Sequence, residues 1–152
     1  MSSHQRTLQH AEAHCAEQGS KLTEKRKFVL LGLLQSGRAL SAYELADYCR
    51  EELGQTMPPM SVYRILEFLE DNRLVHKLKL ASRYVACAHI TCDHGHATPQ
   101  FLICEVCHKV SEIDIKASTL KTLKDNVLNA GFTLASPQLE LNCICNSCAE
   151  TA

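Results

Sequence analysis

The segment Pro58-Pro-Met-Ser-Val-Tyr-Arg-Ile-Leu-Glu-Phe-Leu69 decides how the first half of the chain folds. Its two prolines favour the start of a helix, because proline loses no hydrogen bond in the first helical turn. Four apolar side chains then recur at positions i, i+3, i+4 and i+7, which predicts one buried helix face. These residues are Val62, Ile65, Leu66 and Leu69.

Three further helices and a hairpin are expected around this segment. The helices span about residues 8–18, 23–37 and 41–53, and the hairpin strands span residues 74–80 and 83–86. Thr23 can cap the second helix and Gly37 can end it. Ser41 and Glu44 form a capping box, in which each side chain bonds a backbone amide at the start of the third helix. Helices followed by a hairpin are the element order of a winged helix-turn-helix.

The second half of the chain changes to a mixed pattern of strands and helix. A polar loop rich in His and Cys occupies residues 88–99; strands follow at 101–103 and up to about 115, then a helix at about 117–130 and a strand at about 139–144. The sequence therefore predicts an α+β protein. Residues 1–86 form a winged helix-turn-helix domain, residues 87–152 form a small C-terminal α/β domain, and the hinge lies at about 85–88.

Composition and charge exclude several classes of protein. The 152 residues are 45% hydrophobic with six Gly and four Pro, as in a globular protein. The longest apolar run is too short to span a membrane and the N-terminus has no apolar secretion signal, so a cytoplasmic protein is expected. Residues 1–84 carry 12 Lys and Arg against 10 Asp and Glu, whereas residues 85–152 carry 4 against 7. This asymmetry is a weak signal for nucleic acid contacting the first half.

The polar face of the segment that begins at Pro58 carries the candidate DNA contacts. The planar guanidinium of Arg64 can bond O6 and N7 of one guanine together. Ser61 and Tyr63 can position the helix on phosphates, and Tyr43, in the first turn of the preceding helix, can do the same. The alternative is that these side chains only cover a solvated helix, and many winged helices bind protein instead of DNA.

Nine cysteines in a chain without an export signal indicate metal binding, because the cytosol keeps thiols reduced. The pairs Cys104-Glu-Val-Cys107 and Cys145-Asn-Ser-Cys148 each follow a predicted strand. Two such turns can place four thiolates around one structural Zn²⁺. A redox Cys-x-x-Cys pair would instead begin a helix in a βαβ unit. Cys143, two residues before Cys145, is a rival ligand.

A second set of metal-binding side chains surrounds the hinge. His76 starts the hairpin and Cys87 follows its end, so the two can come close together across the strands. His96 lies in the polar loop, and Glu112 lies on the strand after the first Cys-x-x-Cys turn. One thiolate, two imidazoles and one carboxylate can form a tetrahedral Zn²⁺ site, although each residue alone is equally typical of a solvated surface. Further candidates in the loop are His89, Cys92 and His94.

Taken together, these residues resemble the ferric uptake regulator (Fur) family, and within it the branch that senses zinc. The loop before Cys104 lacks the His-His-Asp-His run that is typical of the iron and manganese branches, and a thiolate at Cys87 suits zinc. The resemblance covers nearly the whole chain. Its matching segments are Leu22-Thr-Glu-Lys-Arg26, Ser41-Ala-Tyr-Glu-Leu45, Pro58 through Tyr63-Arg64, Leu74-Val-His-Lys77, Tyr84-Val-Ala-Cys87, Phe101-Leu-Ile-Cys104-x-x-Cys107 and the last Cys-x-x-Cys pair.

This resemblance implies a homodimer in which residues 87–152 dimerise and bind metal, with two Zn²⁺ per chain. The implied ligands and contacts are Cys104, Cys107, Cys145 and Cys148 for structural zinc, His76, Cys87, His96 and Glu112 for regulatory zinc, and Tyr43 and Arg64 for DNA. The loop between Cys87 and Cys104 can differ in length from that of relatives, so His94 is an alternative to His96 as a ligand. The run Pro59-Met60-Ser61 departs from the family's usual Pro-Thr-Val-Tyr-Arg by one residue, which bears on where the recognition helix starts.

The function expected from the sequence is therefore a zinc-responsive repressor that binds a pseudo-palindromic DNA operator and represses zinc-uptake genes. It is not expected to be an enzyme, to bind a membrane or to take a small-molecule substrate. An iron- or peroxide-sensing regulator of the same family is the nearest alternative, and a cytosolic thiol oxidoreductase is an alternative of another class. Asp47 and Arg50 either pair between neighbouring dimers on DNA or form an exposed pair within one helix.

Overall fold

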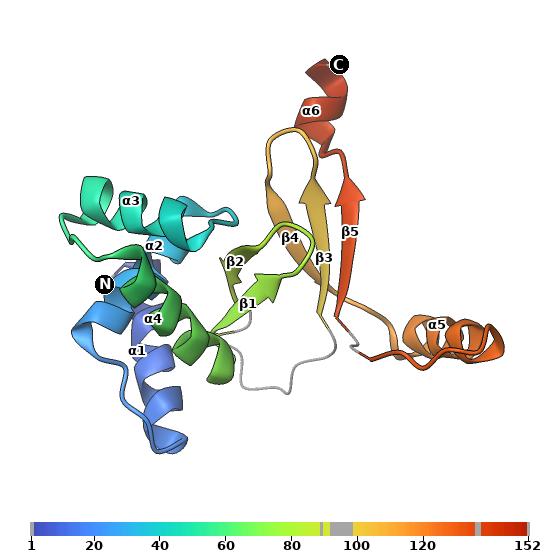
Figure 1. Ribbon diagram of the computed structural model, residues 1–152, viewed down its shortest axis with the longest axis horizontal. Coiled ribbons are helices and arrows are strands. Elements are labelled where there is room, and N and C mark those ends of the chain that lie inside the picture. Colours follow the sequence, from blue (N-terminus) through green and yellow to red (C-terminus); the bar gives the residue numbers. More distant parts are fainter. Residues whose placement is uncertain (1, 89, 92–98, 136–137, 152) are drawn as a thin grey trace. The chain divides into compact units, whose positions relative to one another are not determined.

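The computed structural model describes residues 2–88, 90–91, 99–135 and 138–151 (Figure 1). The chain divides into two compact units, Met1–Asp93 and His94–Ala152, which we call the head unit and the tail unit. The winged helix-turn-helix and the mixed α/β tail predicted from the sequence are both confirmed. Within the described ranges, no helix combines the length and the apolar character that crossing a membrane requires.

The head unit consists of four helices followed by a two-stranded wing. The elements are α1 (Ser3–Glu17), α2 (Glu24–Ser36), α3 (Ala42–Leu53), α4 (Pro59–Asp71), β1 (Val75–Leu78) and β2 (Arg83–Ala86). The strands pair antiparallel. Leu40, just before α3, exchanges two backbone hydrogen bonds with Tyr84 of β2, at 3.0 and 2.9 Å. These bonds join the wing to the segment that precedes α3.

Local side-chain signals set the helix ends in the head unit. Thr23 caps α2, and Ser41 and Glu44 form the predicted capping box on α3. The prediction for the first helix was wrong at its start, because α1 begins at Ser3 rather than near residue 8. A second capping box between Ser2 and Gln5 causes this earlier start, since it satisfies the amides of a polar first turn that buries little apolar surface.

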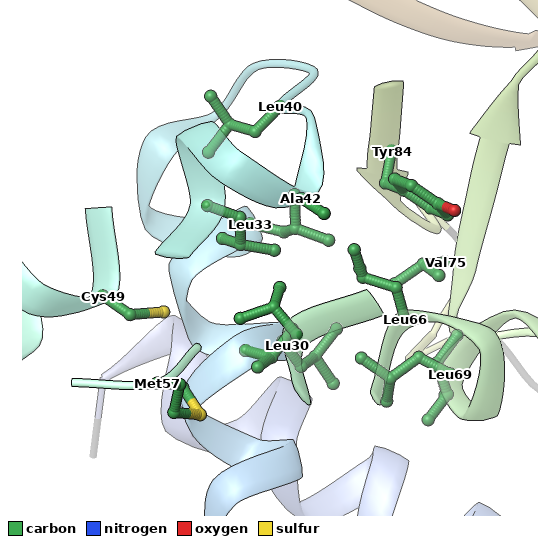
Figure 2. Close-up of a cluster of buried hydrophobic side chains, with 14 of the residues drawn as sticks. Leu30, Leu33, Leu40, Ala42, Cys49, Met57, Leu66, Leu69, Val75 and Tyr84 are labelled. Carbon is green, nitrogen blue, oxygen red and sulfur yellow. The ribbon is translucent and has the colours of Figure 1, made fainter. Parts of the chain in front are cut away.

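The core of the head unit is aliphatic and continuous across its helices and wing. Figure 2 shows Leu30 of α2 and Leu66 of α4 pointing into one cluster, with Tyr84 of β2 beside it. Of the four residues predicted to face inward on α4, three are fully buried and Ile65 is half-buried against the same cluster. The apolar face of α4 is therefore fixed on the core, which leaves its opposite face to solvent.

The tail unit is a three-stranded sheet with two helices. Its elements are β3 (Pro99–Cys104), β4 (Val110–Asp114), α5 (Ala117–Asn129), β5 (Leu139–Cys143) and α6 (Asn146–Thr151). The strand order is β4-β3-β5, and β3 runs antiparallel to β4 but parallel to β5 (Figure 1). The predicted strands and the predicted helix are confirmed. The short helix α6 was not predicted, because it begins inside the second Cys-x-x-Cys pair, where no apolar period marks a helix.

The packing of α4 gives a testable stability difference. Leu66→Ala removes a fully buried side chain and leaves a cavity, so we expect the free energy of unfolding to fall by about 2–5 kcal/mol. Urea denaturation followed by circular dichroism measures the loss. The control is Glu67→Ala, one residue further along on the exposed face, which should change stability by less than about 0.5 kcal/mol. Equal effects of the two variants would contradict the packing described.

Candidate metal centres and DNA-reading surface

Four cysteines of the tail unit converge at the ends of two of its strands. Their four sulfur atoms lie within 4.8 Å of one another. The sulfurs of Cys107 and Cys145 are 3.8 Å apart. A zinc–sulfur bond of about 2.3 Å places the sulfurs of a tetrahedral site about 3.8 Å apart, so the cluster fits Zn²⁺. The members of this tail cluster are Cys104, Cys107, Cys145 and Cys148.

The parallel pairing of β3 with β5 brings the two Cys-x-x-Cys turns together. Cys104, the last residue of β3, is the register partner of Cys143, the last residue of β5. The pairing continues for one more bond, because the amide of Glu105 donates to the carbonyl of Cys143 at 2.9 Å. The first turn closes with His108 in the left-handed region, at φ 64°. Both turns therefore leave the sheet at the same end.

Hydrogen bonds shift the pKa values of three thiols in the tail cluster. Backbone amides of Cys107 and Cys145 donate to the sulfur of Cys104 and lower its pKa to about 6. The amide of Cys148 likewise lowers the pKa of Cys145, whereas the hydrogen bond from the Cys148 thiol to Cys145 raises the pKa of Cys148 to about 12. Four thiols this close do not all ionise unaided, because like charges repel. A divalent cation bound between them allows all four thiols to ionise, because its positive charge offsets their repulsion. A shell of four thiolates suits zinc.

A second pair of metal-binding side chains lies at the wing of the head unit. His76 on β1 is opposite Val85 on β2, and Cys87 follows β2 directly. The amide of Cys87 donates to the carbonyl of Leu74 at 2.9 Å, which extends the hairpin ladder to this residue. An imidazole nitrogen of His76 and the sulfur of Cys87 lie within 4.8 Å of each other. Imidazole and thiolate together suit Zn²⁺.

The structure places only some of the other ligands named from the sequence. Glu112 is a half-buried residue of β4 in the tail unit, opposite Phe101 of β3. The residues His96, His89, Cys92 and His94 lie outside the described part of the chain. Cys143 does not belong to the tail cluster as the described residues define it.

The exposed face of α4 presents the candidate DNA-reading side chains. Arg64 is exposed, and Ser61 is half-buried near the start of the helix. Tyr43, in the first turn of α3, is 66% exposed. Met60, which was not predicted from the sequence as a contact, is 65% exposed and lies one turn before Arg64. An exposed apolar side chain on this helix face can contact a thymine methyl group.

Tyr63 takes a different position from the other candidate DNA contacts. It is half-buried, and its ring packs edge-to-face against Tyr84 of the wing, with centroids 6.3 Å apart. Burial, together with the neighbouring Tyr63, raises the pKa of Tyr84 to about 12, so that phenol stays protonated. Tyr63 therefore joins α4 to β2. On α3, Asp47 and Arg50 form the exposed intrahelical ion pair, at 3.1 Å.

A winged helix joined to a tail with a four-cysteine zinc-type cluster defines a class of metal-dependent DNA-binding regulators. The chain belongs to the ferric uptake regulator family, whose model matches residues 17–142. It is 36% identical over 147 residues to the zinc uptake regulation protein of Escherichia coli strain K12, covering 96% of this chain and 83% of that protein.

Two solved structures are similar over almost the whole chain. A zinc uptake regulator complexed with zinc and DNA has a TM-score of 0.82 and 31% identity, covering 99% of this chain and 98% of that one. The crystal structure of holo XcZur has a TM-score of 0.75 and 34% identity, covering 94% of this chain and 96% of that one.

Removing one sulfur of the tail cluster tests its metal site. We expect Cys104→Ser to lose one zinc per chain and to unfold the tail unit, because a zinc site that binds thiolates contributes its binding energy to folding. Zinc content after dialysis, measured by atomic emission, and circular dichroism report the two losses. The matched control is Cys15→Ala, which removes a buried thiol from α1 of the head unit and should retain all its zinc. Full zinc retention by Cys104→Ser would refute the site.

Proposed function

We propose that this protein is a zinc-responsive transcriptional repressor. In this proposal, a homodimer binds a pseudo-palindromic operator when its regulatory zinc is bound and represses zinc-uptake genes. The single observation that carries the proposal is the His76–Cys87 pair, a zinc-type donor set on the wing that packs beside the recognition helix. Relatives of 31–36% identity are zinc uptake regulators, one of them in complex with zinc and DNA.

The proposed DNA contacts divide into base reading and positioning. Arg64 reads a guanine edge, since its guanidinium is exposed on the solvent face of α4. Tyr43 and Ser61 contact phosphates near the starts of α3 and α4. Tyr63 contacts DNA from the same helix while its ring holds α4 against the wing. Residues 1–86 act in this proposal as the DNA-binding domain.

Exposed apolar side chains of the tail unit support the homodimer. Helix α5 has no buried residue, although its sequence is amphipathic. Large apolar side chains in the tail unit are 41–71% exposed, which is unusual for a surface that meets only water. A two-fold dimer buries the same patch on both copies. The apolar side chains concerned are Val106, Ile113, Leu128, Phe132, Leu141 and Ile144.

The proposal assigns two Zn²⁺ ions to each chain. The tail cluster holds the structural ion, and its sulfur spacing supports that assignment. The regulatory ion has His76, Cys87, His96 and Glu112 as ligands, of which the wing supplies the first two. When bound, the regulatory zinc supplies a cross-link between residues of the reading domain and residues of the dimerising domain.

The ligand set gives a physical account of the switch. Two half-sites of an operator have a fixed separation, so a dimer binds well only when its two heads have the matching separation. Ligands drawn from both domains favour that one arrangement. Changing a population from 1:99 to 99:1 requires about 5.5 kcal/mol of differential binding energy, which a site with four protein ligands can supply. The protein acts in the cytoplasm in this account and catalyses no reaction.

The zinc response is tested by titrating operator binding against buffered free Zn²⁺, with an operator selected from random duplexes. We expect the wild type to bind the operator only as zinc rises, whereas Cys87→Ser should lose this response and still retain one zinc per chain, because its tail cluster is intact. Fluorescence anisotropy and atomic emission measure the two properties. Operator affinity that is indifferent to zinc in the wild type would overturn the proposal.

Base reading is tested separately with Arg64→Ala. We expect operator affinity to fall by about 1–3 kcal/mol, or roughly 5- to 150-fold in Kd, with little change in binding to a scrambled duplex at the same salt concentration. Arg6→Ala, which removes an exposed arginine from α1, is the matched control and should bind the operator almost as the wild type does. If both variants weaken operator and scrambled duplex alike, Arg64 reads no base.

A further inference from the structure

Cys143 is a fifth thiol beside a site that needs only four. It ends β5 directly opposite Cys104, which ends β3, in the parallel register of the two strands. Partners in such a register point to the same face of the sheet, and neighbouring strands lie about 4.8 Å apart. That spacing falls within the 4.4–6.8 Å range of Cα–Cα distances that a disulfide bridges. The Cα atoms of Cys143 and Cys104 therefore lie within the range that a disulfide spans.

Both cysteines also line the same cavity. This cavity has a volume of about 350 Å³ and is lined by Cys104, Cys143 and Cys145, together with Leu102 and Ser111 of the same sheet face. It is large enough for several molecules the size of water or hydrogen peroxide, since a water molecule occupies about 30 Å³. A small oxidant can therefore reach Cys143 and its neighbours from solvent.

The surroundings of Cys143 leave its sulfur available for chemistry. The side chain is half-buried, and its thiol donates one weak hydrogen bond to the carbonyl of Leu141, at 3.6 Å. It lies outside the four-sulfur tail cluster, whose members can supply the four ligands of a tetrahedral site without it. Cys15 and Cys49 differ in this respect, because both are fully buried in the head unit.

We infer that Cys143 is a redox modification site that forms a disulfide with Cys104 when the protein meets hydrogen peroxide or a related two-electron oxidant. Forming this bond removes one of the four thiolates of the tail cluster and so releases the structural zinc. The zinc-release part of the inference rests on the proposed assignment of zinc to that cluster, whereas the disulfide itself does not.

The chemistry balances in two steps. In the first, the Cys143 thiol loses its proton to solvent and the thiolate attacks one oxygen of hydrogen peroxide; the O–O bond breaks, a sulfenic acid forms, and the hydroxide leaves as water with one proton from solvent. In the second, the Cys104 thiolate attacks the Cys143 sulfur, the S–O bond breaks, and the hydroxide leaves as water with one proton from solvent. Two thiols lose two electrons in total, and one peroxide accepts them. Zn²⁺ held by the tail cluster would lose one of its four ligands, and its oxidation state would not change.

Strand spacing also predicts that the bond is easily reduced. Cβ atoms of directly opposed residues on parallel strands lie about as far apart as the strands, slightly beyond the 3.5–4.5 Å of a relaxed disulfide. A disulfide held at that spacing is strained, and strained disulfides are the readily reduced ones. We therefore expect a small dithiol to restore both cysteines and allow zinc to rebind.

The test exposes the full-length, zinc-loaded protein to one molar equivalent of hydrogen peroxide. A chromogenic chelator measures zinc release, and tandem mass spectrometry of the digested protein maps the disulfides. We expect the wild type to form the Cys104–Cys143 disulfide and release zinc, with recovery after dithiothreitol and fresh zinc. Cys143→Ser should hold the same zinc before treatment and release it several-fold more slowly. Cys15→Ala serves as the control and should behave as the wild type does.

Each other outcome is decisive. If disulfides join only Cys104 to Cys107 or Cys145 to Cys148, and Cys143→Ser releases zinc at the wild-type rate, the inference is wrong. It is also wrong if untreated Cys143→Ser and Cys143→Ala fold but lack the tail zinc, since Cys143 is then a ligand. Absence of tail zinc from the untreated wild type counts against the proposed function instead, and the disulfide map still decides whether Cys143 pairs with Cys104.

Discussion

The parallel register between β3 and β5 is the constraint on which the tail unit depends. This register sets Cys104 opposite Cys143 and so brings two Cys-x-x-Cys turns, almost forty residues apart in sequence, to one end of the sheet. A slip of one residue would turn every side chain of β5 to the other face and would separate the two turns. Metal held by both turns would in turn fix the register, because it would penalise any other pairing. Strand pairing and metal binding would then stabilise each other.

The two units need this reinforcement to different degrees. In the head unit, helices and wing share one continuous aliphatic cluster. In the tail unit, by contrast, Phe101, Ile103 and Cys104 are the buried hydrophobic residues among the described ranges 99–135 and 138–151. A core of that size contributes little free energy to folding. Small domains commonly gain further stability from bound metals or from a second subunit. In the proposed function, the cysteine cluster and the apolar surface around α5 supply those two additions, which links metal binding, dimerisation and folding in this half of the chain.

Sequence reasoning succeeded where the determining interactions are local. Thr23, Ser41 and Glu44 cap their helices within four residues of their own position, and α4 follows from a single apolar period. It failed for α6, which owes its place to the second Cys-x-x-Cys turn rather than to an apolar pattern. It also missed how Tyr63 is used, because the contact with Tyr84 joins residues 21 positions apart and depends on how the wing folds back on α4. Spacing identified the cysteine pairs, but the strand order that joins them is a tertiary property.

In the proposed function, ligand chemistry accounts for one permanent zinc and one responsive zinc in the same protein. The tail cluster offers four soft sulfur ligands; backbone amides lower the pKa values of Cys104 and Cys145, whereas the pKa of Cys148 is raised. The proposed regulatory set has one thiolate, and its imidazoles and carboxylate bind zinc less strongly than thiolates do. In this proposal, the tail cluster fills at lower free zinc, and the mixed set fills only when zinc is plentiful. A zinc sensor requires this order of filling. If the structural zinc bound only at high free zinc, the protein would unfold when zinc is scarce, which is the condition it has to sense.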